Sequence, residues 1–231
     1  MSRIAIILAR GGSKRLPRKN ILDFQGKPML AWSVLAAIES QMYSRVLVST
    51  DDEEIAAIAR DYGAEVPFLR ESAADDMATS SEATLAALTQ AEAFWGERYG
   101  SVSQLMANCP LRNSNDIRVA VQSFERRGVA SQLSCFRYGW MNPWWALQLD
   151  TDGRAIPLFP DALQQRSQDL QELFCPSGAI WICRAESLKQ HRTFQIEDRA
   201  YLPMHWIAAM DIDDEDDLAM AKSCYAMANS G

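Results

Sequence analysis

The sequence predicts an α/β fold built on a mostly parallel sheet with helices on both faces. Its 231 residues suit one large α/β domain. Residues 4–9 form an uninterrupted apolar run, which is typical of a strand buried on both faces of a parallel sheet. Strand-like and helix-like segments then alternate up to about residue 136. That alternation predicts a doubly wound sheet.

Composition and charge argue against several classes of protein. The formal net charge of −7 disfavours general binding to nucleic acids or anionic membranes. No apolar stretch approaches the roughly 20 residues of a membrane span, and the short run before the basic loop is not expected to be a signal peptide. The five cysteines form no CxxC pair and the two histidines have no ligand spacing. We therefore expect a cytoplasmic protein with reduced thiols and no zinc site.

Helices are predicted where apolar residues recur at helical spacing and polar residues can cap the first turn. Thr50 and Glu53 have the spacing of a capping box, as do Thr79 and Glu82, and Ser114 is the expected cap of a later helix. The predicted helices cover residues 29–40, 54–62, 80–95, 114–127, 185–190 and 218–228. The predicted strands cover residues 4–9, 45–50, 65–68, 103–107, 131–136, 175–183 and 207–213.

The regular pattern breaks between residues 138 and 175. Trp140, Trp144 and Trp145 lie within six residues, and apolar residues 146–150 precede a Thr-Asp-Gly turn that indicates a hairpin. An aromatic, irregular insertion in a small α/β enzyme commonly covers a ligand or meets a partner chain. It can also form a local core under a long loop, and the residues alone leave both interpretations open.

The loop after the first strand has the composition of a phosphate-binding site. Gly11 and Gly12 allow backbone N–H groups to approach a ligand. Five cations lie within ten residues of an otherwise acidic chain, namely Arg10, Lys14, Arg15, Arg18 and Lys19. The carboxyl end of a strand is where open α/β sheets bind ligands. The alternative is a solvated turn. The spacing is neither that of a Walker A loop nor that of a dinucleotide-binding loop.

A second group of residues lies near the other end of the chain. Asp211 and Asp213 are two apart in a predicted strand, so their carboxylates are expected on the same face, where they repel one another. A divalent cation would relieve that repulsion, and oxygen ligands suit Mg²⁺. Alternatively, acids before a helix can simply complement its dipole, which accounts well for residues 214–217. A basic loop and a dicarboxylate site together provide what nucleotidyl transfer needs.

Several stretches resemble the CMP-sialic acid synthetase family, the acylneuraminate cytidylyltransferases. The signature loop is matched by residues 9–20, and further stretches are residues 48–56, 62–66, 109–112, 178–180 and 211–213. The resemblance implies a Rossmann-like three-layer nucleotidyltransferase fold, with residues 138–175 as a small dimerisation insertion of a homodimer. It also implies that CTP and a nonulosonic acid react, with Mg²⁺, to give a CMP-sugar for surface polysaccharide biosynthesis and pyrophosphate.

The resemblance also assigns residues. It implies catalytic roles for Arg10, Lys19 and Asp213, and metal binding by Asp211 and Asp213. The implied nucleotide contacts are Ala9, Arg10, Gly11, Gly12, Ser13, Lys14, Lys19, Asn20 and Ser80. The implied sugar contacts are Met106, Arg166, Gln168 and Ser177.

Two departures concern the choice of sugar. Sialic acid enzymes often carry glutamine at the position of Met106 and asparagine at that of Ser177, so a legionaminic or pseudaminic acid branch is expected here. The alternatives are a transferase for another sugar or base, or a catalytically silent nucleotide-binding protein. The presence of Arg10, Lys19 and both aspartates argues against the silent protein.

Overall fold

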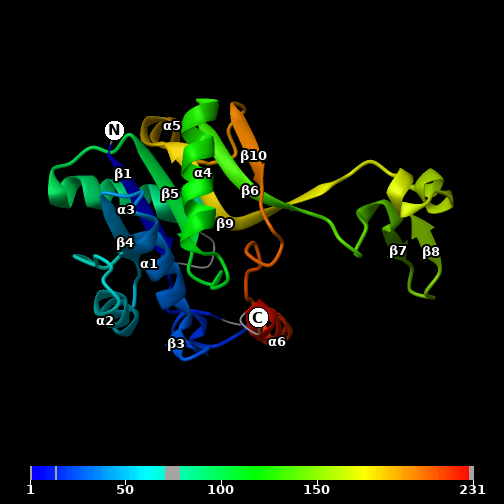
Figure 1. The fold of residues 1–231 in the computed structure, drawn as a ribbon, viewed down its shortest axis with the longest axis horizontal. Coiled ribbons are helices and arrows are strands. Elements are labelled where there is room, and N and C mark those ends of the chain that lie inside the picture. The colour runs from blue at the N-terminus through cyan, green and yellow to red at the C-terminus, as the bar shows by residue number, and fades with distance from the viewer. Residues whose placement is uncertain (1, 14, 71–78, 229–231) are drawn as a thin grey trace.

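The computed structural model describes residues 2–13, 15–70 and 79–228. Its centre is a six-stranded sheet in the order β10-β6-β9-β5-β1-β4 (Figure 1). The strands are β1 (Arg3–Leu8), β4 (Arg45–Ser49), β5 (Ser101–Met106), β6 (Ser131–Arg137), β9 (Phe174–Arg184) and β10 (Arg199–Pro203). β1 runs parallel to β4 and β5, and β10 runs parallel to β6. β9 is antiparallel to both of its neighbours, β5 and β6.

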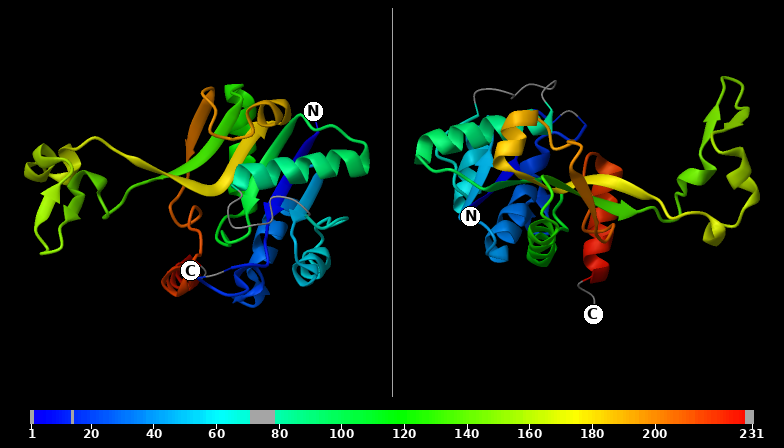
Figure 2. Two further views of the ribbon diagram at one scale, coloured as in Figure 1. Left: turned by 180° about the vertical axis from the view of Figure 1, so that it is seen from behind. Right: turned by 90° about the horizontal axis from the view of Figure 1, so that it is seen from above.

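Helices cover both faces of the sheet, which confirms the three-layer arrangement (Figure 2). One face packs against α1 (Met29–Ser40), α2 (Glu53–Asp61) and α4 (Ser114–Arg127). The other packs against α3 (Ser80–Trp95) and α5 (Ala185–His191). Residues 4–7 of β1 have no exposed surface, as the apolar run predicts. Among the described residues, no helix has the length and apolar character to cross a membrane.

Two helix caps differ from the predictions by one or two residues. Asp52, rather than Thr50, caps α2, because its carboxylate accepts hydrogen bonds from the first-turn N–H groups while the Thr50 hydroxyl accepts from Asp52 N. Asn113, rather than Ser114, caps α4 and forms a capping box with Asp116. The predicted capping box at the start of α3, between Thr79 and Glu82, is confirmed.

The prediction of a strand over residues 207–213 is wrong. The strand of this region is β10, and residues 206–209 form turns before the chain continues irregularly to residue 213. Ala209 N donates to the carbonyl groups of His205 and Trp206, and Met210 N donates to that of Ile207. These local hydrogen bonds replace a sheet ladder, although the apolar run 207–210 has the composition of a strand. The last helix, α6 (Glu215–Ala228), follows.

Short elements connect the first loop to α1. They are a 3₁₀ turn, η1 (Lys19–Ile21), and a two-stranded ribbon of β2 (Asp23–Phe24) and β3 (Lys27–Pro28). Ile212 packs beside this region in a small core with Leu16, Phe24, Met29 and Leu218. The loop after β1 and the start of α6 are therefore held against each other by apolar contacts.

The insertion between β6 and β9 forms an arm that extends away from the sheet (Figure 1). It contains η2 (Pro143–Trp145), β7 (Leu147–Leu149), β8 (Ala155–Pro157), η3 (Pro160–Gln164) and η4 (Ser167–Asp169). The antiparallel pairing of β7 and β8 confirms the predicted hairpin. Trp144 packs edge-on against Phe159 in a small local core, with ring centroids 5.1 Å apart. Trp140 and Leu149 are nonetheless 86% and 67% exposed, so much apolar surface of the arm remains uncovered.

Candidate functional site

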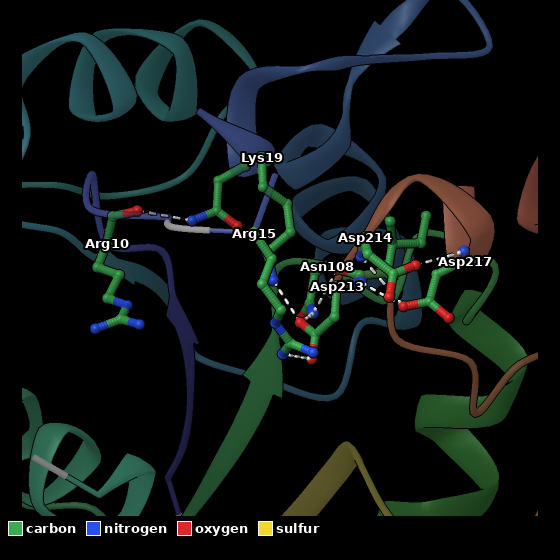
Figure 3. Close-up of polar contacts among 9 residues, drawn as sticks. Arg10, Arg15, Lys19, Asn108, Asp213, Asp214 and Asp217 are labelled. Atoms are coloured by element: carbon green, nitrogen blue, oxygen red, sulfur yellow. Dashed lines mark hydrogen bonds and ion pairs between the residues drawn. The ribbon is translucent and has the colours of Figure 1, made fainter. Parts of the chain in front are cut away.

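Polar side chains from distant parts of the chain meet at the carboxyl ends of β1, β4 and β5. The loop after β1 supplies residues 9–20, the turn after β4 supplies Asp51 and Asp52, and the turn after β5 supplies Asn108. The segment before α6 completes the group with Asp213 (Figure 3). This is the edge of an open α/β sheet at which ligands bind.

The backbone of the first loop is fixed by the turn after β4. Ala9 is buried, and its N–H donates to Ser49 O at 3.1 Å. Gly11 N donates to Asp51 Oδ1 at 3.0 Å. A Cβ atom on Gly11 would lie 2.8 Å from Asp52 Oδ2, whereas one on Gly12 would meet no atom within 4 Å. Gly11 is therefore required by close packing, and Gly12 leaves room for a ligand.

Asn20 and Ser13 complete this loop. The buried Asn20 side chain donates through Nδ2 to Arg10 O at 2.9 Å, so it braces the loop from inside. Ser13 N donates to Gly11 O at 3.1 Å. In Figure 3 the Arg10 side chain points away from the cluster around Asp213. Lys14 lies outside the described residues.

The loop cations Arg15, Arg18 and Lys19 are paired with carboxylates. Lys19 Nζ lies 2.6 Å from Asp213 Oδ1, and Arg15 Nη2 lies 2.5 Å from Asp213 Oδ2. Arg18 forms ion pairs with Asp52 and Glu54 instead. The basic loop and the acidic segment, 194 residues apart at Lys19 and Asp213, thus form one site. Each carboxylate oxygen of Asp213 is therefore paired with a cation.

The two aspartates predicted to bind metal have different environments. Burial and the neighbouring charge of Asp213 raise the pKa of Asp211. Burial acts in the same direction on Asp213, but Lys19 and Arg15 outweigh it and hold its pKa below the ordinary value. Residues 211–213 are not a strand, so the expected placement of both carboxylates on one strand face is absent, although the charge of Asp213 still acts on Asp211. Asp213 is kept ionised by its cationic partners.

The carboxylates of this site suit a hard divalent cation that takes only some of its ligands from the protein. Among the described residues, no group of three or more His, Cys, Asp or Glu side chains is placed to hold a metal ion. Two carboxylates are present, however, and Mg²⁺ is commonly bound by one or two carboxylates together with waters and substrate phosphates. The residues therefore fit a metal that a triphosphate helps to hold.

Arg70 is a site residue that the sequence interpretation missed. It is buried, its N–H donates to Thr50 O at 2.7 Å, and its Nε has no hydrogen-bond partner within the part of the chain described. Burial lowers the pKa of Arg70, Asp51 raises it, and Arg10 lowers it. An incompletely paired arginine close to a second arginine is suited to an anion. Its only signal in the sequence is its place at the start of a polar segment.

The structure separates the four residues predicted to contact the sugar. Met106 ends β5, and its Cγ would lie 3.1 Å from a Cβ on Gly178, the neighbour of Ser177. Ser177 Oγ is 2.8 Å from Ser134 Oγ. Arg166 and Gln168 are exposed and belong to the arm, which extends away from the sheet (Figure 1). One chain therefore brings Met106 and Ser177 to adjoining strands but does not bring the arm residues to them.

Ser80 is the first residue of α3, directly after the capping residue Thr79. Its carbonyl accepts a hydrogen bond from Thr84 Oγ1 at 2.7 Å, and its side chain is partly exposed. Thr84 in turn donates to Gln104 Oε1 of β5 at 3.0 Å. The start of α3 is thus tied to the central sheet.

The Cys109-Pro-Leu-Arg112 stretch has a structural role. Arg112 is fully buried and donates to Ala179 O and to Ser33 Oγ, so it connects β9 to α1 beneath the site. Cys109 is also buried, and burial raises the pKa of its thiol to about 12. A thiol with that pKa is not a nucleophile at neutral pH.

Comparison with known proteins gives consistent results. A family model described as cytidylyltransferase matches residues 4–156. The chain is 33% identical over 230 residues to a pseudaminic acid cytidylyltransferase of Campylobacter jejuni, covering 97% of each chain. It is 31% identical over 238 residues to a CMP-N,N'-diacetyllegionaminic acid synthase of Legionella pneumophila, covering 95% of this chain and 94% of the other.

Structural comparison supports the fold. A CTP complex of CMP:2-keto-3-deoxy-manno-octonic acid synthetase superimposes with a TM-score of 0.72 at 17% identity, covering 99% of this chain and 100% of the other. A cytidylyltransferase from Leptospira borgpetersenii superimposes with a TM-score of 0.62, at 18% identity, covering 98% of this chain and 87% of the other. Both superpositions extend over nearly the whole of this chain, so its fold is like theirs.

Proposed function

The chain belongs to the cytidylyltransferase family, and from this premise we propose that it transfers CMP from CTP to a nonulosonic acid. The products would be a CMP-sugar and pyrophosphate. The observation that carries the proposal is the contact of Lys19 and Arg15 with Asp213, which joins a basic loop to paired carboxylates at the ligand-binding edge of the sheet. The names of the two relatives above support a sialic acid-like sugar.

In the proposed reaction, the triphosphate takes over the cations of the loop. Arg15 and Lys19 turn from Asp213 to the phosphate oxygens, and Lys19 stabilises the charge that develops in the transition state. Asp211 and Asp213 are the residues that would hold a divalent metal, which we propose to be Mg²⁺. When bound, this metal would orient the triphosphate and neutralise part of its charge. In this exchange of partners, Arg15 and Lys19 are paired with Asp213 before CTP binds and with phosphate oxygens afterwards. Asp213 would then be paired with the metal, so none of these charges is left without a partner.

The remaining loop residues would position the nucleotide. A Cβ on Gly12 would meet no atom within 4 Å, so a phosphate has room beside the backbone of this loop. Arg10 and the incompletely paired Arg70 would bind anionic or carbonyl oxygens of CTP, and Ser80 would approach the base from the start of α3. Lys14 and Asn20 belong to the same loop, Asn20 as a brace.

The bond change is an in-line displacement at the α-phosphorus of CTP. The anomeric hydroxyl oxygen of the sugar forms the new P–O bond as the bond to the β-phosphate breaks and pyrophosphate leaves. The hydroxyl proton is lost toward the carboxylate region of the site. No covalent enzyme intermediate is needed, in keeping with the buried, protonated Cys109.

We propose that the sugar site is completed by a second copy of the chain. The arm carries exposed apolar residues, including Trp140 and Leu149, that a homodimer would bury. A cavity of about 780 Å³ at the base of the arm, lined by Trp140, Gln168 and Trp206, is large enough to receive part of a partner. Arg166 and Gln168 of one protomer would then face Met106 and Ser177 of its partner.

A coupled assay of pyrophosphate release tests this function. The enzyme, CTP and Mg²⁺ are incubated with pseudaminic, legionaminic and N-acetylneuraminic acids, and with the octulosonic acid as a sugar outside the class. We expect release with CTP and at least one nine-carbon acid. Pyrophosphate release with another nucleoside triphosphate but not with CTP would refute the assignment of CTP as the nucleotide. Release only with the octulosonic acid would refute the assignment of a nonulosonic acid as the sugar.

A further inference from the structure

Asn108 is connected to the acidic segment by three hydrogen bonds. Ile212 N donates to Asn108 O at 2.9 Å, and Asn108 Nδ2 donates to Ile212 O at 3.0 Å. A single residue therefore satisfies both backbone polar groups of the buried Ile212. The same Nδ2 atom donates its second hydrogen bond to Asp213 Oδ1 at 3.3 Å.

These bonds matter because the acidic segment has no sheet ladder to fix it. Residues 211–213 are irregular, so the two-residue period of a strand does not align the carboxylates of Asp211 and Asp213. The other fixed point is Asp217, whose carboxylate accepts from the N–H groups of Asp213 and Asp214. It holds the backbone at the start of α6 and does not contact the Asp213 side chain. Figure 3 shows Asn108 and Lys19 converging on that side chain.

Among the described groups that contact the Asp213 carboxylate, Asn108 differs in how it would respond to a nucleotide. Arg15 is 67% exposed and Lys19 is 16% exposed, and a triphosphate would attract both. The Asn108 amide is buried, uncharged and already bound to Ile212 O, so a triphosphate has little means of moving it. It would therefore stay on Asp213 if the cations moved to the triphosphate in the proposed exchange.

We propose that Asn108 is a positioning residue that holds the Asp213 carboxylate for the divalent metal of the metal–nucleotide complex. The inference rests on the proposed function, because it takes Asp213 to be a metal ligand. In this role the turn after β5, through Asn108, orients the carboxylate of Asp213, which lies near the other end of the chain. The side-chain amide, and not only the backbone of this turn, is then needed for the metal to strengthen CTP binding.

The test measures CTP binding by isothermal titration calorimetry without sugar, once with Mn²⁺ and once with EDTA. The readout is the dissociation constant measured with EDTA divided by that measured with Mn²⁺. This ratio reports how much the metal strengthens CTP binding and is insensitive to a general loss of folded protein. Asn108→Leu keeps the branched shape of the side chain and removes its donors. Asn113→Ala is the matched control, since Asn113 caps α4 five residues away and has no contact with Asp213. Asp213→Asn reports whether the metal ligand itself is assigned correctly.

We expect the ratio to fall at least tenfold in Asn108→Leu and in Asp213→Asn, and to keep its wild-type value in Asn113→Ala. A wild-type ratio in Asn108→Leu together with a reduced ratio in Asp213→Asn would overturn the role of Asn108 and leave the proposed function intact. A wild-type ratio in Asp213→Asn would overturn the metal site itself. If Asn108→Leu does not fold, Asn108→Ser has a hydroxyl too short to reach Asp213, and the same fall is expected.

Discussion

Replacing Lys19 by methionine removes the cation that joins the basic loop to the acidic segment. Lys19 Nζ lies 2.6 Å from Asp213 Oδ1 and its side chain is 16% exposed, so solvent screens this charge only in part. Loss of one aligned donor to a developing transition-state charge costs roughly 3–4 kcal/mol. We therefore expect kcat of Lys19→Met to fall about 10²- to 10³-fold.

The assay is continuous pyrophosphate release at saturating sugar, with kcat and the KM for CTP determined separately. Lys27→Met is the matched control, because Lys27 lies over the Trp32 ring at 4.4 Å in the ribbon beyond the site. We expect Lys27→Met to retain the wild-type kcat. If Lys19→Met keeps a kcat within a few-fold of wild type, then Lys19 does not stabilise the transition state and the proposed exchange of partners is wrong.

Three further predictions concern the loop, the arm and the acid stability of the protein. Gly11→Ala should weaken CTP binding about tenfold or more in a titration, because its Cβ would lie 2.8 Å from a carboxylate oxygen, whereas Gly12→Ala, with open space around it, should change the fold of the loop little. If the arm forms the proposed dimer, Leu149→Asp should sediment as a monomer in analytical ultracentrifugation at concentrations where the wild-type chain is dimeric, and a variant that stays dimeric would refute the role of the arm. Lys19 and Arg15 hold the pKa of Asp213 below its ordinary value of 3.8, so this interaction stabilises the fold above about pH 4 and is lost as the pH falls through the lowered pKa. Asp213→Asn should therefore flatten the acid side of the stability–pH curve measured by denaturant unfolding, and an unchanged curve would contradict the ion pairs.

Local patterns in the sequence predict most of the fold. The apolar run of residues 4–9 becomes the buried strand β1, and Thr79 and Glu82 form the expected capping box. These signals depend on neighbours within a few residues, so they can be recognised without knowledge of the tertiary structure. The segment 207–213 shows where such reasoning fails. Its apolar residues have strand composition, but turn hydrogen bonds and the burial of Ile212 against Leu16 determine its path.

The site was predictable in its residue types and not in its pairings. Charge and residue type point to the basic loop and the two aspartates, but the strand spacing expected at Asp211 and Asp213 is absent from the structure. No local pattern indicates that Lys19 and Arg15 bind Asp213 while Arg18 turns to Asp52, because these contacts depend on the order of strands in the sheet. Arg70 lies in an irregular stretch and Asn108 in a short turn, neither with any periodicity, and only the fold brings them to the site.

The central claim is that the basic loop and the acidic segment act as one catalytic unit in cytidylyl transfer. The most direct test is a double-mutant cycle in which CMP-sugar formation is measured for Lys19→Met, Asp213→Asn and the double variant. Groups that act together show non-additive losses, so we expect the double variant to lose about as much activity as the more impaired single variant. Losses that multiply, or a single variant with wild-type activity, would contradict the claim.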